Sequence, residues 1–268
     1  MKKKNSTQPL LSIRRLSKSF GGLKAVSEIS LDIAPGEILS IIGPNGSGKT
    51  TLFNLISGIY QPDGGEVCLH LPEQPPVNLV GQPPDRITAH GVARTFQNIR
   101  LFANMTVLEN VMVGMHCRTK SGPISAVLQT KAYRREEQQA MEQAQRLLAL
   151  FRNHLRRVMN EPAKTLPYAE RKRLEIIRAL ASGPKLVLLD EPAAGMNPHE
   201  TRELMHDLKR LRDLGYTLMV IEHDMMMVKG LSDRVIAFDY GRKIAEGTFD
   251  EVRRNELVIE AYLGRKHS

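Results

Sequence analysis

One glycine-rich segment constrains this chain more than any other part of its sequence. It follows an apolar run at residues 38–42, and a helical pattern comes directly after it, at residues 50–57. A short, nearly continuous apolar run is typical of a strand buried on both faces. The segment matches G-x-x-x-x-G-K-[ST] at every position, and in this strand–loop–helix setting the match predicts a phosphate-binding loop. Its residues are Gly43, Pro44, Asn45, Gly46, Ser47, Gly48, Lys49 and Thr50.

The residue types in this loop fit the phosphate groups of a nucleotide. Glycines let the backbone curl until successive N–H groups point into one concavity, and the helix N-terminus adds its positive dipole end there. Lys49 supplies a cation for the β- and γ-phosphates, and the hydroxyl of Thr50 is a ligand for Mg²⁺. We predict that the loop and the next residue, Thr51, bind nucleotide. A chance glycine-rich turn would not require the strand and the helix around it.

A pair of carboxylates follows another apolar run. Residues 186–189 are all apolar, and Asp190 and Glu191 come directly after them. Carboxylates at the C-terminal end of a strand in an α/β sheet face the crevice where ligands bind. Asp190 would hold Mg²⁺, directly or through its water, and Glu191 would polarise or deprotonate an attacking water. An acidic strand end alone is common, but after a complete phosphate loop the pair predicts hydrolysis of a nucleotide.

The apolar pattern predicts an α/β fold. The runs at 186–189 and 218–221 each follow a helix-like segment, and this order of strand and helix implies a mostly parallel sheet with right-handed crossovers. Residues 11–34 alternate apolar and polar positions, which is typical of half-exposed, antiparallel strands. We therefore expect a parallel-sheet core of the phosphate-loop type with an added antiparallel β layer.

Residues 103–160 differ in composition from the rest of the chain. They are rich in Met, Gln, Arg and Leu, and residues 134–155 have the pattern of one or two helices, so we expect an inserted helical subdomain. The proline-rich stretch 70–90 is typical of a loop. The expected parts are a flexible basic N-terminus at 1–10, a core at 11–95 and 166–250, a helical insertion at 96–165, and a C-terminal tail at 251–268.

The composition is that of an ordinary globular chain. Aromatic residues make up 5% and tryptophan is absent, which leaves few rings for binding single-stranded nucleic acid. The net charge of +9 is spread over small clusters, which we interpret as solvated faces, with contact to anionic lipid as the second interpretation. The isolated cysteines Cys68 and Cys117 favour neither a disulfide scaffold nor a zinc site. No stretch has the pattern of a signal peptide or the length of a membrane span.

The order of these motifs resembles that of the ABC ATPases over essentially the whole chain. Residues 93–97, which read Ala-Arg-Thr-Phe-Gln, resemble the family's glutamine loop, and residues 220–224 resemble its switch-histidine segment. The resemblance implies ATP as substrate with Mg²⁺. It also implies that Gln97 contacts the metal and the water, that His223 bonds the γ-phosphate and holds Glu191, and that Phe20 stacks on adenine. Taken alone, each of these three residues would be a solvated or core side chain.

The resemblance narrows to importers of branched-chain amino acids. The similar segments are residues 96–102, 105–110, 190–198, 221–225 and 258–264. ATPases of urea and amide importers and of lipopolysaccharide export share much of this pattern, and they remain alternatives. An ABC ATPase acting on nucleic acid or the ribosome is the alternative from another class, although the long coiled coils or second ATPase domain of those proteins are absent from this sequence.

One motif departs from the family pattern. The family's signature segment usually reads L-S-G-G-Q and closes over ATP bound by another subunit. Here Pro167 removes both a hydroxyl and an N–H, and Ala169 replaces a glycine that permits close approach. Asn197 stands where an aspartate is usual. The aligned signature residues are Leu166, Pro167, Tyr168, Ala169 and Glu170.

The resemblance also implies an assembly. It consists of two transmembrane permease subunits, a second ABC ATPase subunit, which favours a heterodimer, and an extracytoplasmic solute-binding protein. This chain would be peripheral on the cytoplasmic face of a bacterial inner membrane, and no nucleic-acid partner is expected. The transported substrate does not follow from this chain, because the ATPase subunit never contacts it.

Overall fold

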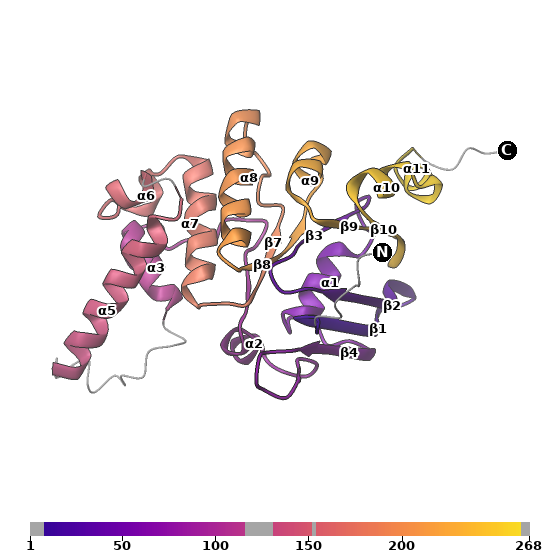
Figure 1. Cartoon of the computed structure of the whole chain (residues 1–268), viewed down its shortest axis with the longest axis horizontal. Helices are drawn as coiled ribbons and strands as arrows, with labels where there is room; N and C mark the ends of the chain where they lie inside the picture. Colours follow the sequence, from indigo (N-terminus) through magenta and orange to yellow (C-terminus); the bar gives the residue numbers. More distant parts are fainter. Residues whose placement is uncertain (1–7, 116–130, 152–153, 264–268) are drawn as a thin grey trace, which may run out of the picture.

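The computed structural model describes residues 8–115, 131–151 and 154–263. Most of the predicted N-terminal segment, Cys117 and the end of the predicted tail lie outside these residues. The described chain is an α/β structure with two sheets (Figure 1).

The larger sheet has six strands and is almost entirely parallel. Neighbouring strands pair in parallel except at one edge, where β10 runs antiparallel to β9. The predicted parallel core is confirmed. Its strands, in spatial order, are β10 (Arg242–Gly247), β9 (Arg234–Asp239), β3 (Ile38–Ile42), β8 (Thr217–Ile221), β7 (Leu186–Asp190) and β6 (Val92–Arg94).

The smaller sheet is antiparallel, as the alternation over residues 11–34 predicts. Its strands, in spatial order, are β2 (Leu23–Ile33), β1 (Leu11–Phe20), β4 (Gly64–Leu69) and β5 (Val77–Asn78). Helix α1 (Lys49–Ile56) lies between the two sheets (Figure 1), and its buried side chains Leu52, Phe53 and Ile56 share one core with both. The helix that begins at the phosphate loop is therefore fixed by packing on two sides.

Alternate side chains of the parallel strands pack into different cores. Leu186 and Leu188 face α1, whereas Val187 and Leu189 face a core made largely by helices on the opposite side. This explains why these strands have unbroken apolar runs. The helices that contribute to the opposite core are α3 (Val107–Gly114), α5 (Lys131–Leu148), α6 (His154–Arg157), α7 (Tyr168–Ala181), α8 (Pro198–Asp213) and α9 (Met225–Leu231).

The helical region predicted around residues 134–155 is present as α5 and α6. Together with α3 they form one end of the molecule, and α7 lies between them and the parallel sheet (Figure 1). At the other end the described chain ends in two short helices, α10 (Phe249–Arg254) and α11 (Glu256–Leu263). Among the described residues, no helix combines the length and the hydropathy that crossing a lipid bilayer requires.

The loop predicted at residues 70–90 is partly wrong. Its second half forms helix α2 (Pro84–His90), and β5 precedes it. Pro84 occupies the first turn of α2, where a helix leaves its N–H groups unbonded and a proline is well tolerated. Gly91 ends the helix with a φ of 106°. Pro84 therefore marks the start of a helix, although the proline-rich stretch predicted a loop.

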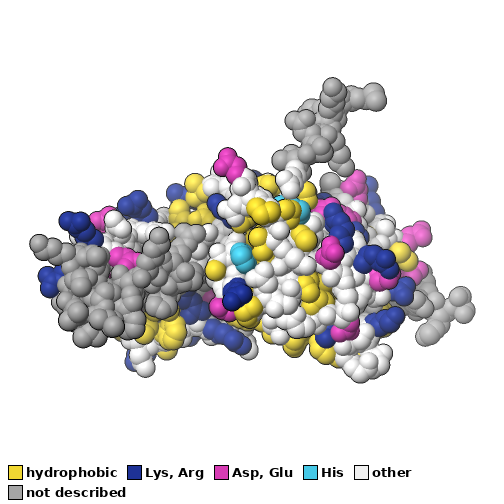
Figure 2. All heavy atoms as spheres, turned by 90° about the horizontal axis from the view of Figure 1, so that it is seen from below, with side chains coloured by type: hydrophobic (Ala, Val, Ile, Leu, Met, Phe, Trp, Pro, Cys, Tyr) yellow, Lys and Arg dark blue, Asp and Glu magenta, His cyan; other side chains and the backbone are white. Residues whose placement is uncertain are grey.

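Basic side chains are dispersed over the described surface. On the face drawn in Figure 2, lysines and arginines are scattered among acidic and apolar side chains. The interpretation of the clusters as solvated faces is wrong for residues 171–173, because Lys172 and Arg173 are buried against neighbouring elements.

Arg234 links the two sheets. From β9 it donates two hydrogen bonds to Glu37, at 2.7 and 3.0 Å, and it also bonds the carboxylate of Glu246 and the carbonyl oxygen of Asp32. Asp32 belongs to β2, and Glu37 comes just before β3. One guanidinium therefore connects the antiparallel layer to the parallel core.

We expect Arg234→Met to lower the free energy of unfolding by about 3 kcal/mol, because it leaves the largely buried Glu37 carboxylate without its ion pair. Replacing Glu37 by Met as well removes the unpaired charge and should recover part of the loss. Urea unfolding of the variants measures both. Arg242→Met, on the exposed part of β10, is the control; an equal loss for both arginines would contradict the linking role.

Candidate active site

The phosphate-binding loop runs from the end of β3 to the start of α1, and two of its glycines have no room for a side chain. A Cβ on Gly43 would lie 2.2 Å from the carbonyl oxygen of Phe238, and one on Gly48 would lie 2.2 Å from that of Ala25. Both residues also have positive φ, 147° and 101°. The loop is thus pressed between β9 and β2 in a conformation that only glycine adopts easily.

Lys49 lies across this loop. Its Nζ donates to the carbonyl oxygens of Gly43 at 2.8 Å and of Pro44 at 2.9 Å. Burial lowers the pKa of Lys49, and the nearby carboxylates of Glu191 and Asp190 oppose that shift. Thr50 and Thr51 follow on α1, and Thr50 is exposed. The ammonium group and the threonine hydroxyl are therefore at the loop, where predicted phosphates and metal would be.

Asp190 ends β7 and pairs with Arg94, which ends the neighbouring strand β6. Nη2 of Arg94 donates to Oδ2 of Asp190 at 3.0 Å, while Nη1 donates to Asn54 at 2.6 Å and to Ser57 at 3.0 Å. Burial raises the pKa of the Asp190 carboxyl, and Arg94 opposes the shift. The sequence pattern alone assigned Arg94 no role. Its place at the end of a strand parallel to β7 is the signal that would have found it.

Glu191, Gln97 and His223 lie together. Nε2 of Gln97 donates to Oε2 of Glu191 at 2.9 Å, and Nε2 of His223 lies 3.0 Å from Oε1 of the same carboxylate. The histidine donates in the tautomer that carries its proton on Nε2. Glu191 has a φ of 48°, in the left-handed region. The structure brings three of the predicted catalytic residues into direct contact around one carboxylate.

Glu222 is a site residue that sequence reasoning missed. It is 4% exposed, and its two carboxylate oxygens accept from the backbone N–H of Ala193, at 2.9 Å, and of His223, at 3.1 Å. Burial raises the pKa of this carboxyl. Glu222 thus joins the segment after Glu191 to the segment that carries the histidine. A charged residue at the end of a buried strand was the available signal.

Phe20 lies apart from these contacts, at the end of β1. The residue is 43% exposed, and the ring of Tyr60 meets its ring edge-on, with the centroids 5.2 Å apart. Nζ of Lys18 lies 5.5 Å from the centre of the Phe20 ring. The ring is available to a flat ligand, but no described contact connects it to Lys49 or Glu191.

The predicted signature segment leads into α7. Pro167 is the N-cap of this helix, Ala169 is buried, and the ring of Tyr168 lies against Gly195. Asn197 caps α8, where its side chain accepts from two backbone N–H groups. Asn197 therefore has a local structural role in addition to any part in a subunit interface.

Two segments of the chain match described families. Residues 26–194 match the ABC transporter family, and residues 242–268 match a family described as branched-chain amino acid ATP-binding cassette transporter. One relative is the high-affinity branched-chain amino acid transport ATP-binding protein LivG of Escherichia coli (strain K12), 44% identical over 96% of this chain and 99% of LivG. The high-affinity branched-chain amino acid transport ATP-binding protein BraF of Pseudomonas aeruginosa is 41% identical over 96% of this chain and 99% of BraF.

Solved structures agree with the sequence matches. The ADP conformation of MJ1267, an ATP-binding cassette of an ABC transporter, superimposes with a TM-score of 0.82 at 31% identity and covers 97% of this chain and 100% of MJ1267. A nucleotide-free ATP-binding cassette from an ABC transporter gives 0.81 at 30% identity, over 96% and 100%. The chain therefore belongs to the ABC transporter family and is an ATPase, and the predicted fold class is confirmed.

The two loop glycines Gly48 and Gly46 allow a matched test of the close contact between Gly48 and the carbonyl oxygen of Ala25. Both have positive φ, but a Cβ on Gly46 would meet open space. We expect Gly46→Ala to cost about 1–2 kcal/mol for its conformation alone. Gly48→Ala should cost about 3–4 kcal/mol, because the clash with Ala25 adds to that strain. Urea unfolding without nucleotide measures the difference, and equal losses would show that the loop yields to a side chain.

Proposed function

We propose that this chain is the ATP-hydrolysing subunit of an ABC importer for branched-chain amino acids. The observation that carries the proposal is the Glu191 carboxylate, bonded by both Gln97 and His223 beside the phosphate loop. The names of LivG and BraF and the match at residues 242–268 support the substrate class.

The reaction is hydrolysis of ATP to ADP and phosphate. Water attacks the γ-phosphorus, and the bond from the γ-phosphorus to the oxygen that bridges the β- and γ-phosphates breaks, so that ADP leaves. Glu191 accepts the proton of the attacking water. Lys49 binds the β- and γ-phosphates, and Phe20 stacks on adenine. His223 bonds the γ-phosphate and holds Glu191 in place. Most of the acceleration comes from positioning and from the charges fixed around the phosphates.

The residues around Asp190 fit Mg²⁺. The hydroxyl of Thr50, the amide oxygen of Gln97 and the carboxylate of Asp190 are the oxygen ligands that this cation prefers. When bound, the ion would neutralise charge on the β- and γ-phosphates. Arg94 occupies only Oδ2 of Asp190 in the described contacts. The pair thus keeps the carboxylate oriented and leaves its other oxygen to the metal or its water.

The proposed assembly contains two permease subunits, a second ABC ATPase and a solute-binding protein, with this chain peripheral on the cytoplasmic face of the membrane. A cavity of about 420 Å³ between α3 and α7 supports the permease contact. Arg100 and Phe102, which follow Gln97, line it together with Val113 and Arg178. A permease segment would dock there, next to the loop that carries Gln97.

Glu191→Gln tests the central assignment. It removes the proton acceptor but no phosphate contact, so ATP binding should be nearly unchanged while turnover in the assembled complex falls about 100-fold or more. Lys49→Ala should instead weaken ATP binding itself. Nucleotide titration and phosphate release measure the two effects.

The same variant tests the transported substrate. In cells that lack the wild-type subunit, uptake of radiolabelled leucine should return with the wild-type chain and not with Glu191→Gln. Restored uptake of urea without leucine would contradict the proposed substrate class. A wild-type ATPase rate for Glu191→Gln would contradict the proposed role of the carboxylate.

The signature segment predicts two unequal ATP sites. Pro167 lacks the hydroxyl and the N–H of the usual residue, so the partner's ATP loses donors, whereas ATP on Lys49 meets the partner's own signature. One lost hydrogen bond to a charged group reduces the rate by about one to two decades. Mutating the catalytic glutamate in each subunit separately should reduce ATPase activity much more for Glu191. Equal losses, or a fully active homodimer, would refute the asymmetry.

A further inference from the structure

Helix α7 carries two buried charged side chains on one face. Lys172 and Glu175 are three residues apart, a spacing that places them side by side on a helix, and each is 2% exposed. The signature segment leads into the N-terminus of this same helix. The face points toward residues 96–100, which include Gln97.

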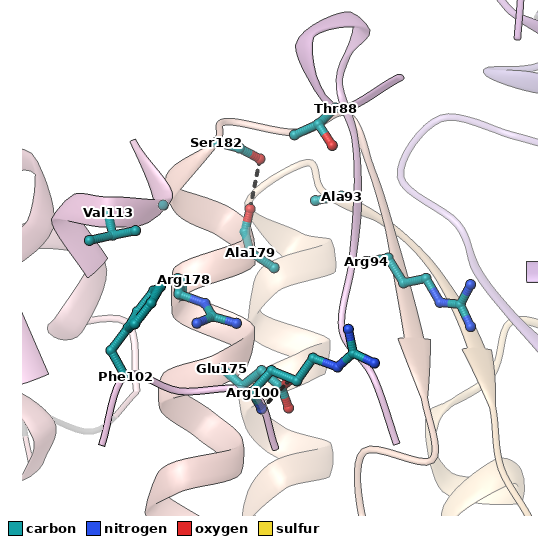
Figure 3. Close-up of a pocket in the computed structure, with 11 residues that line it drawn as sticks. Thr88, Ala93, Arg94, Arg100, Phe102, Val113, Glu175, Arg178, Ala179 and Ser182 are labelled. Carbon is teal, nitrogen blue, oxygen red and sulfur yellow. Dashed lines mark hydrogen bonds between the residues drawn. The ribbon is translucent and has the colours of Figure 1, made fainter. Parts of the chain in front are cut away.

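Both side chains bond the backbone of that loop. Nζ of Lys172 donates to the carbonyl oxygen of Gln97 at 2.6 Å and to that of Phe96 at 3.4 Å. Oε1 of Glu175 accepts from the N–H of Arg100 at 3.3 Å, a contact drawn as a dashed line in Figure 3. Together the two side chains bond the backbone of the loop at both of its ends.

Fixing the loop with buried ions is costly. Burial lowers the pKa of Lys172 and raises that of Glu175, although each charge partly offsets the shift of the other. Apolar side chains of similar size would fill the same space at no desolvation cost, so general packing does not explain these two residues. Their hydrogen bonds to the loop do, because apolar side chains cannot supply them.

The loop connects this pair to the reaction. Gln97, whose carbonyl oxygen accepts from Lys172, donates through its side chain to Glu191 at 2.9 Å. The path from α7 to the catalytic carboxylate therefore consists of one lysine, one residue of the loop and two hydrogen bonds.

We propose that Lys172 and Glu175 are positioning residues that fasten the glutamine loop to the signature helix, so that closure of the signature on the partner's ATP moves Gln97 at this chain's own Glu191. The inference rests on the proposed function, since it needs a signature that acts across the subunit interface. It gives the two ATP sites a direct connection through one helix, carried by backbone contacts of the loop.

Lys172→Met is the first test. In the assembled complex it should lower kcat for ATP hydrolysis about tenfold, because Gln97 is no longer fixed beside Glu191. The dissociation constant for ATP measured without Mg²⁺ should not change, since no described contact joins Lys172 to the phosphate loop. The thermal midpoint should fall, because the buried Glu175 loses its neighbouring charge, so the rates are compared at a temperature at which the variant is folded. Lys172→Arg should restore the rate, because a guanidinium also donates to carbonyl oxygens. Lys229→Met, at an exposed lysine of α9, is the matched control.

A double-mutant cycle tests the path through Gln97. If Lys172 acts through this residue, adding Lys172→Met to Gln97→Ala should change the rate less than twofold. A further tenfold loss in the double variant would overturn the inference. Glu175→Gln and Glu175→Leu provide a second pair, because Gln keeps an acceptor for the Arg100 N–H and Leu does not. Only the Leu variant should lose activity.

Hydrogen exchange separates this inference from the proposed function. In the full chain without nucleotide, amides of residues 96–100 should exchange faster in Lys172→Met than in the wild type or in Lys229→Met. An unchanged exchange rate, or a wild-type kcat for Lys172→Met in an active complex, would refute the fastening of the loop. A wild-type complex without ATPase activity would instead refute the proposed function, whatever the exchange result.

Discussion

Four parallel strands of the larger sheet have their C-terminal ends side by side, and every proposed catalytic residue follows one of these strand ends. The phosphate loop leaves β3, Glu191 leaves β7, His223 comes after β8, and Gln97 comes after β6. Residues 43 to 223 are far apart in sequence, but parallel pairing places their strand ends next to one another. Each side chain needs only a short loop to reach the others, and the large cores on both faces of the sheet keep the strand ends in register.

The sequence was most informative where a pattern depends on backbone requirements. The phosphate loop was predictable because glycine alone fits against Phe238 and Ala25, and the buried strands because both of their faces are covered. The pairing of Arg94 with Asp190 was not predictable in the same way, because it depends on which strands are neighbours. The helix at 84–90 was missed because the sequence alone does not show whether a proline occupies the first turn of a helix or interrupts one. The roles proposed for Phe20, Gln97 and His223 still rest on the family resemblance and the described contacts, and remain predictions.

Buried charge is concentrated around the site. The buried groups are Lys49, Lys172, Asp190, Glu175, Glu222 and the side chain of Arg94, and most of them bond backbone atoms of the loops that carry the proposed catalytic residues. In a low-dielectric interior such groups are expensive unless each is hydrogen-bonded. The desolvation cost of these groups is consistent with their function of holding each loop of the site in one position. As charged groups they also respond when a charged ligand binds. Elsewhere the described core is mainly apolar, apart from the buried pair of Arg173 on α7 and Asp207 on α8.

The left-handed backbone at Glu191 affects which residues this position can accept during evolution. A φ of 48° costs a residue with a side chain about 1–2 kcal/mol relative to glycine. The bend turns the chain sharply after Asp190, so that two successive carboxylates serve different partners, Arg94 on one side and His223 on the other. A glycine at this position would relieve the strain but would also remove the carboxylate that we propose as the proton acceptor. Stability alone would therefore favour glycine here, and the strained glutamate is consistent with the proposed hydrolysis.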